Sequence, residues 1–154
     1  DVLVADPYVD PASVAAVGAR QVDLDELLAR SDAISLHARL TPETRHIVSR
    51  AAIAKMRPGA VLVNGARGGL LDYDAVCDAL ESGHLRAAAF DVYDPEPPAA
   101  GSRLFTAPNV VLSPHIAGAS RETAERAARI GAAEVGRWLR GEALRHVANP
   151  DALA

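Results

Sequence analysis

The sequence has 154 residues, the length of one domain, and 49% of them are hydrophobic, which is enough for a substantial core. Charged residues make up 23% and the formal net charge is −4, with acids and bases interspersed, so no basic stripe points to nucleic acid. No apolar run reaches the length of a membrane span, and the single Cys77 excludes an internal disulfide framework and fits a reducing compartment.

The first predicted element is a short buried strand over residues 2–5, which ends before Pro7 because proline cannot donate to a β-ladder. Asp6 stands at the tip of this strand, where a carboxylate can accept hydrogen bonds from ribose hydroxyls. An Asp before Pro is also common in ordinary turns, so both roles stay open for Asp6. The sequence enters the strand directly after Asp1, and we therefore expect the chain to be part of a longer protein.

The remaining elements alternate between strand and helix. Apolar runs predict strands over residues 33–37, 60–63, 85–92 and 110–113. Capping residues predict helices that begin near Asp23, Ser49, Asp72 and Ser120 and run to about residues 30, 56, 81 and 140. This alternation is typical of an α/β domain with a parallel sheet. The last helix has small and apolar residues at near i, i+4 spacing, which we expect to face the sheet: Ala124, Ala128, Ala132, Val135 and Leu139.

Three short signatures each follow a predicted strand. Residues 64–69 read NGARGG, residues 91–97 read DVYDPEP, and residues 113–118 read SPHIAG. In an open parallel sheet the ligand lies across the carboxyl ends of the strands, so side chains far apart in the sequence can meet there. We therefore expect four polar residues of these signatures to line one site: Arg67, Asp91, Glu96 and His115.

The residue types in these signatures fit acid–base chemistry on an acidic substrate. Arg67, between glycines, can hold a carboxylate or carbonyl oxygen in its planar fork. His115 can donate and accept a proton near neutral pH, and a carboxylate such as Glu96 on its other ring nitrogen fixes the tautomer and favours the imidazolium. Each residue alone is more often structural, as a turn arginine, a solvated loop acid or a turn histidine. Their joint occurrence at consecutive strand ends favours the functional interpretation.

Other kinds of catalytic site are absent from the sequence. No HExxH or CxxC spacing indicates a metal site, and we expect no metal. No G-x-S-x-G elbow or Walker lysine loop is present. Cys77 falls in a predicted helix without a neighbouring base, so we expect it to be an inert thiol.

Together the three signatures resemble those of the NAD-dependent D-2-hydroxyacid dehydrogenase family, which includes phosphoglycerate, glycerate, glyoxylate and D-lactate-type enzymes. The resemblance implies an incomplete Rossmann-like parallel sheet with flanking helices, in which the first strand and the glycine-rich loop are missing. Residues 1–141 would form a partial NAD-binding domain. Residues 142–154 would be a C-terminal tail that returns toward an absent substrate domain.

The resemblance also assigns roles to single residues. His115 would move the proton at the 2-oxo or 2-hydroxyl group, paired with Glu96, and Arg67 would hold the carboxylate and carbonyl of the substrate. Arg67 and His115 would also contact the cofactor. Five further residues would do so: Asp6 at the ribose, Asp91 at the nicotinamide carboxamide, and Gly65, Ala66 and Gly118 beside the nicotinamide. A carboxylate at Asp6 would favour NAD over NADP, because it repels a 2′-phosphate.

The implied function is hydride transfer between NAD(H) and a small 2-hydroxy or 2-oxo acid. The implied protein is a cytoplasmic homodimer without nucleic-acid or membrane partners. Two alternatives stay open: an NAD-sensing, corepressor-like binding protein and a catalytically dead remnant. Because the 154 residues contain no G-x-G-x-x-G phosphate loop, we expect this chain alone to be inactive and to bind NADH weakly.

Overall fold

The computed structural model describes residues 1–149 and divides into two compact units, one of residues 1–115 and one that begins at Ile116. The strands of the first unit are β1 (Leu3–Val4), β2 (Arg20–Gln21), β3 (Ala33–Leu36), β4 (Ala60–Asn64), β5 (Leu85–Phe90) and β6 (Val110–Leu112). Its helices are α1 (Pro11–Ala16), α2 (Leu24–Arg30), α3 (Arg50–Lys55) and α4 (Tyr73–Glu81), with 3-10 turns η1 (Gly68–Leu70) and η2 (Arg103–Phe105).

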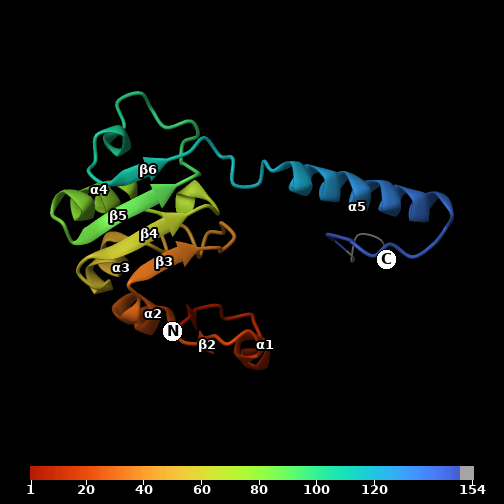
Figure 1. Ribbon diagram of the computed structural model, residues 1–154, viewed down its shortest axis with the longest axis horizontal. Coiled ribbons are helices and arrows are strands. Elements are labelled where there is room, and N and C mark those ends of the chain that lie inside the picture. Colours follow the sequence, from red (N-terminus) through yellow and green to blue (C-terminus); the bar gives the residue numbers. More distant parts are fainter. Residues whose placement is uncertain (150–154) are drawn as a thin grey trace. The chain divides into compact units, whose positions relative to one another are not determined.

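The strands form two sheets, and every pairing between them is parallel. One sheet has four strands in the order β3-β4-β5-β6, and the other pairs β1 with β2 (Figure 1). The predicted α/β fold with a parallel sheet is therefore confirmed. Because all strands of a parallel sheet point the same way, the segments after β3, β4, β5 and β6 all leave from one edge.

Side-chain caps explain where the predicted helices begin. Asp23, Ser49 and Asp72 each accept a hydrogen bond from a backbone N–H in the first turn of α2, α3 and α4. The sequence analysis missed α1 and β2, which lie between Tyr8 and Val22. Both are too short to show a hydrophobic period, although Asp10 as a cap before Pro11 is a recognisable helix start.

Helices α2, α3 and α4 follow one another along the same core, and α4 packs on β5. The core contains Leu28, Ile53, Leu62, Val76 and Phe90, each at most 4% exposed. Cys77 is also buried here, and burial raises the pKa of its thiol, which fits the predicted inert role. This core fixes the strands whose carboxyl ends carry the three signatures.

Between β1 and β3 the two sheets are separated by a cavity of about 930 Å³, lined by residues of both strands and by Leu27 of α2. The carbonyl groups of Val2 and Val4 bond to the segment of β2, so the backbone groups of Leu3 face the other way. The same alternation turns the backbone groups of Ser35 away from β4. Backbone pairing is thus interrupted between β1 and β3, and the strands form two separate sheets.

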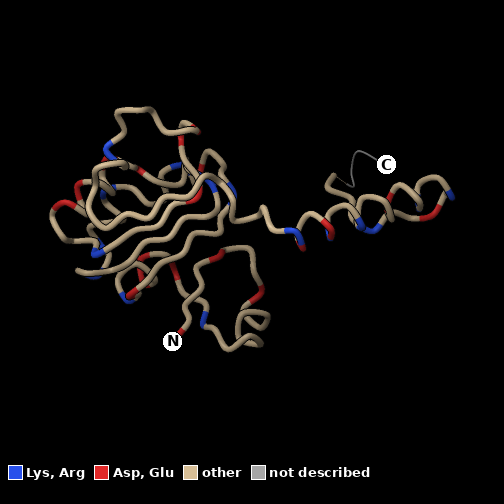
Figure 2. Tube along the Cα trace, turned by 45° about the horizontal axis from the view of Figure 1, so that its top comes forward, with Lys and Arg blue, Asp and Glu red and all other residues tan. Residues whose placement is uncertain are grey.

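The second unit consists mainly of α5 (Arg121–Leu139), which Ser120 caps through the N–H of Thr123. None of the residues of α5 is buried, and Val135, Trp138 and Leu139 are 58%, 69% and 71% exposed. Within this unit, the small and apolar positions at near i, i+4 spacing are exposed, and their orientation toward the sheet stays a prediction. Among residues 1–149, no helix combines the length and apolar character that crossing a membrane requires. Acidic and basic residues are interspersed along the trace (Figure 2).

Candidate active site

The first signature is a turn held from inside by Asn64, the last residue of β4. Asn64 is fully buried; its Oδ1 accepts a hydrogen bond from the N–H of Ala66 at 3.0 Å, and its Nδ2 donates to the carbonyl oxygen of Arg67 at 2.9 Å. A single side chain therefore sets the path of residues 65–67. The sequence analysis assigned no role to Asn64, although an Asn at a strand end is a common turn former.

Glycines bring this turn against the segment that follows β5. A Cβ atom on Gly68 would lie 2.0 Å from the carbonyl carbon and oxygen of Tyr93, and one on Gly69 would lie 3.0 Å from the carboxylate of Asp94. Arg45 forms an ion pair with the same Asp94 at 3.1 Å. Loops after β3, β4 and β5 therefore meet, and Gly68 is required because a side chain would overlap backbone.

Arg67 is exposed, and its guanidinium donates to the carbonyl oxygen of Ala66 at 2.6 Å. Within residues 1–149 it forms no hydrogen bond or ion pair with Glu96 or His115. The structure thus places Arg67 in a loop at the same edge of the sheet but does not join it to the other two residues.

Glu96 and His115 lie together, as the sequence predicts. The Nδ1 atom of His115 and Oε1 of Glu96 are 2.6 Å apart, and the two side chains are 49% and 39% exposed. With Nδ1–H donating to the carboxylate, Nε2 is the ring nitrogen left to exchange a proton with a ligand. His115 has a φ of 54°, in the left-handed region that few residues other than glycine adopt.

Ser113 connects this pair to Asp91. Its Oγ donates to Oδ1 of Asp91 at 2.5 Å, and its carbonyl oxygen accepts from the N–H of His115 at 3.1 Å and from the hydroxyl of Tyr93 at 2.8 Å. The sequence analysis did not single out Ser113 or Tyr93, although both lie inside the signatures. Nothing in the sequence alone shows that their polar groups point toward one another.

Asp91 is 8% exposed, and its N–H donates to the carbonyl oxygen of Asn64, so it follows β5 at the predicted edge. Asp6 follows β1 and is exposed; its Oδ1 accepts from the N–H of Tyr8 at 2.8 Å, and its carbonyl oxygen accepts from Gln21 Nε2 at 2.7 Å. Asp6 therefore forms the local turn that was one of its two predicted roles. A second carboxylate oxygen is still available for a ribose hydroxyl.

The three small residues predicted to line the nicotinamide lie in turns. Gly65 and Ala66 belong to the turn that Asn64 holds, and a Cβ on Gly65 would meet nothing within 4 Å. Gly118 belongs to the second unit, in the exposed turn before α5, where a Cβ would also meet nothing within 4 Å. The open turn at Gly65 leaves backbone accessible to a flat ligand.

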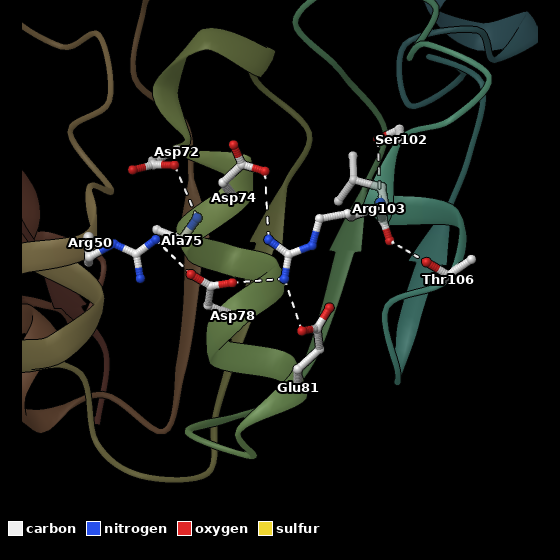
Figure 3. A network of polar contacts seen from close by, with 10 residues as sticks. Arg50, Asp72, Asp74, Ala75, Asp78, Glu81, Ser102, Arg103 and Thr106 are labelled. Carbon is white, nitrogen blue, oxygen red and sulfur yellow. Dashed lines mark hydrogen bonds and ion pairs between the residues drawn. The ribbon is translucent and has the colours of Figure 1, made fainter.

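The loop that carries Glu96 is fixed at its far end by ion pairs on α4. Arg103 contacts Asp78 at 2.8 Å, Glu81 at 2.9 Å and Asp74 at 3.7 Å, and Arg50 reaches the same Asp78 at 2.7 Å (Figure 3). These bonds lower the pKa of Asp78 and raise that of Arg103. The network anchors η2 to the helix, away from the Glu96–His115 pair.

The arrangement suits an organic cofactor. In residues 1–149 no group of three His, Cys, Asp or Glu side chains could hold a metal ion. A buried carboxylate at Asp91, a strand-end carboxylate at Asp6 and an open glycine turn are instead the groups that a nicotinamide carboxamide, a ribose and a planar ring require. The residues present therefore fit a dinucleotide.

Comparisons with known proteins show which family this chain is similar to. The family model for the D-isomer specific 2-hydroxyacid dehydrogenase, NAD binding domain, matches residues 1–117. A D-3-phosphoglycerate dehydrogenase of Mycobacterium leprae is 43% identical over 150 residues, which cover 97% of this chain and 28% of that protein.

Solved structures give the same result. A glyoxylate reductase from Paecilomyes thermophila matches with a TM-score of 0.86 and 35% identity. The match covers 97% of this chain and 45% of the reductase chain. A D-lactate dehydrogenase with NAD+ from Lactobacillus jensenii matches with a TM-score of 0.85 and 28% identity. This match covers 96% of this chain and 48% of the dehydrogenase chain. The chain spans less than half the length of these relatives. It belongs to the D-isomer specific 2-hydroxyacid dehydrogenase family and corresponds to the NAD binding domain of that family.

Proposed function

We propose that this chain is the NAD-binding and acid–base part of a dehydrogenase that interconverts a small 2-hydroxy acid and its 2-oxo acid. The observation that carries the proposal is the 2.6 Å contact between His115 Nδ1 and Glu96 Oε1 at the carboxyl edge of a parallel sheet. When bound, NAD(H) supplies or accepts the hydride at carbon 2. The chain supplies the proton transfer and the positioning.

The proton chemistry follows from the tautomer. In reduction, His115 as imidazolium donates the Nε2 proton to the 2-oxo oxygen while Nδ1–H stays bonded to Glu96. In oxidation, neutral His115 takes the hydroxyl proton at Nε2. In both reduction and oxidation, the negative charge of the Glu96 carboxylate stabilises the positively charged ring of His115. Arg67, at the same edge, stabilises the carboxylate of the substrate and the charge on the carbonyl oxygen.

Besides Arg67 and His115, five residues would hold the cofactor. Asp6 would accept from the ribose hydroxyls, Asp91 would contact the carboxamide, and the turns at Gly65, Ala66 and Gly118 would lie beside the nicotinamide. A negative charge at Asp6 supports NAD rather than NADP. The support for these roles is the position of Asp6 and Asp91 directly after β1 and β5.

The substrate class and the assembly are part of the proposal. Relatives of this chain are named for phosphoglycerate and glyoxylate, which supports a small hydroxy or oxo acid. We propose a homodimer by analogy with the family. A cytoplasmic location is supported by the single cysteine, a buried free thiol.

The test is turnover by the natural gene product that carries this chain, with NADH and a panel of 2-oxo acids. We expect reduction of at least one acid, and His115→Ala should lower kcat by about a hundredfold or more, the usual contribution of a general acid. His84→Ala is the control, because His84 precedes β5 at the opposite edge of the sheet and its ring bonds to the carbonyl oxygen of Ile53. NADH binding without turnover of any acid would instead favour an NAD-sensing binding protein, and neither binding nor turnover would indicate a dead remnant.

A further inference from the structure

Tyr93 bonds directly to Glu96 and is connected to His115 through the carbonyl oxygen of Ser113. Its backbone N–H donates to Glu96 Oε2 at 3.3 Å, and its hydroxyl donates to the carbonyl oxygen of Ser113 at 2.8 Å. Ser113 O is also the acceptor for the N–H of His115 at 3.1 Å. We propose that Tyr93 is a positioning residue, which sets the geometry of the catalytic pair without touching the substrate.

The backbone N–H of Tyr93 bonds to the carboxylate oxygen of Glu96 that His115 does not contact. Oε1 of Glu96 bonds to His115 Nδ1, and Oε2 accepts from Tyr93. With both oxygens engaged, rotation of the carboxylate would break two bonds instead of one. The backbone of Tyr93 is itself fixed, because its carbonyl group packs against Gly68 with no room for a side chain there.

The hydroxyl side of Tyr93 holds the turn that presents His115. The N–H of His115 bonds back to Ser113 O across Pro114, a three-residue turn, and His115 has a φ of 54°. A left-handed φ in a residue other than glycine persists only when its surroundings hold it. The hydroxyl of Tyr93 donates to Ser113 O, the acceptor atom of this turn. The same hydroxyl lies 3.1 Å from the carbonyl oxygen of Phe90, the last residue of β5, and so connects the turn to that strand.

The hydroxyl can serve only as a donor in this arrangement. A phenol has one proton, and both of its neighbours, Phe90 O and Ser113 O, are acceptors, so the shorter contact to Ser113 is the stronger bond. Burial of the ring, with further contributions from the nearby carboxylates of Asp91 and Glu96, raises the pKa of Tyr93. A raised pKa favours the protonated hydroxyl, which is the form that donates to Ser113 O.

The role as a positioning residue for catalysis rests on the proposed function, but the geometry can be tested without turnover. Tyr93→Phe removes the hydroxyl and leaves the ring and the amide in place. Tyr73→Phe is the matched control: the hydroxyl of Tyr73 donates to the carbonyl oxygen of Val92, one residue before Tyr93, at 2.8 Å, but reaches neither Ser113 nor Glu96. Each change deletes one partly buried hydroxyl that donates to a backbone carbonyl oxygen.

The first measurement is exchange of the His115 Nδ1–H with water, followed by NMR in the 154-residue chain. Loss of one hydrogen bond from the turn should speed this exchange roughly fivefold in Tyr93→Phe and leave it unchanged in Tyr73→Phe. Equal exchange in both variants, or no change in Tyr93→Phe, would overturn the proposal. If Tyr93→Phe does not fold, 3-fluorotyrosine at position 93, a stronger donor, should slow the exchange, and unchanged or faster exchange would overturn the proposal.

The second measurement is steady-state turnover in the natural gene product. Tyr93→Phe should lower kcat about fivefold with little change in KM, because the misplaced ring affects the transition state more than substrate binding. Tyr73→Phe should lower Tm by a similar amount but keep kcat. A fall in kcat that follows Tm in both variants would reduce Tyr93 to a purely structural residue. Absence of all turnover would count against the dehydrogenase proposal and leave the exchange result standing.

Discussion

Single residues at this site are constrained by backbone contacts as much as by their chemistry. Gly68 lies where any Cβ would overlap the carbonyl group of Tyr93, whereas Gly65, three residues earlier in the same turn, has open space around it. The motif contains both glycines, and only the tertiary contact separates their roles. One is needed for packing between two loops, and the other leaves room for a ligand.

We therefore expect Gly68→Ala to destabilise the chain by about 1–3 kcal/mol, the usual cost of forcing a methyl group into a packed site. The backbone of residues 93–94 must move to accommodate it, because the overlapping atoms belong to the main chain. Urea unfolding followed by circular dichroism measures the change. Gly65→Ala is the control and should unfold at nearly the same urea concentration as the wild-type chain; equal losses in both variants would contradict the packing argument.

Glu96 makes a second prediction at the residue scale. In the natural gene product, Glu96→Gln should shift the pH profile of 2-oxo acid reduction toward lower pH, because an amide does not stabilise the imidazolium of His115 as a carboxylate does. The profile of kcat/KM against pH measures this shift. Glu43→Gln, in an exposed loop, serves as the control. A Glu96→Gln profile identical to the wild type would remove Glu96 from the proton chemistry.

Among the elements, α4 joins the core to the loop that carries Glu96. Its inner face is buried through Ala75, Val76 and Leu80, while Asp78 and Glu81 on the outer face bind Arg103 of η2 (Figure 3). The helix thus supports the sheet on one side and anchors the active-site loop on the other. The half-exposed positions of these ion pairs limit their individual contributions.

Arg103→Met should lower Tm by a few degrees at pH 7, and the difference from the wild type should shrink in acid. The pKa of Asp78 is lowered by its bonds to Arg103 and Arg50. A carboxylate whose pKa is lower in the folded state than in the unfolded state stabilises the fold. This stabilisation is complete above the unfolded-state pKa, about 3.9, and is lost as the pH falls through the folded-state pKa. Melting curves at pH 7 and pH 3 test this, with Arg86→Met, an exposed change on β5, as control. A difference that is the same at both pH values would rule out the ion pairs as its source.

For the molecule as a whole, the interruption between β1 and β3 is the main departure from a continuous sheet. The edges of both strands line the same cavity of about 930 Å³, and Asp6 follows one of these strands while His37 follows the other. In dinucleotide-binding folds the glycine-rich phosphate loop also lies at a strand end beside the ribose carboxylate. The 154 residues contain no G-x-G-x-x-G sequence for this position.

We expect this chain by itself to bind NADH with a Kd well above the micromolar range, since phosphate contacts at a helix N-terminus are a major part of dinucleotide binding. Fluorescence titration of NADH against the 154-residue chain measures the affinity. The natural gene product, titrated in the same way, is the comparison and should bind more tightly. Micromolar binding by the chain alone would show that residues 1–154 hold the cofactor without a phosphate loop.

The sequence by itself determined the order of strands and helices from residue 24 onward and the strand-end positions of Glu96 and His115, whose pairing was implied by the family resemblance. Apolar runs, caps and strand-end signatures are local features, and in a parallel sheet local features at strand ends share one edge. The short elements α1 and β2 gave too little periodic signal, so they were missed.

Only the tertiary structure decided which polar groups meet. It showed that Asn64 shapes the arginine turn, that Ser113 joins Asp91 to His115, and that Arg67 stands apart from the pair. These outcomes depend on the directions of side chains and the distances between loops that are far apart in sequence. Such quantities are set by packing across the whole sheet, and no single stretch of residues encodes them.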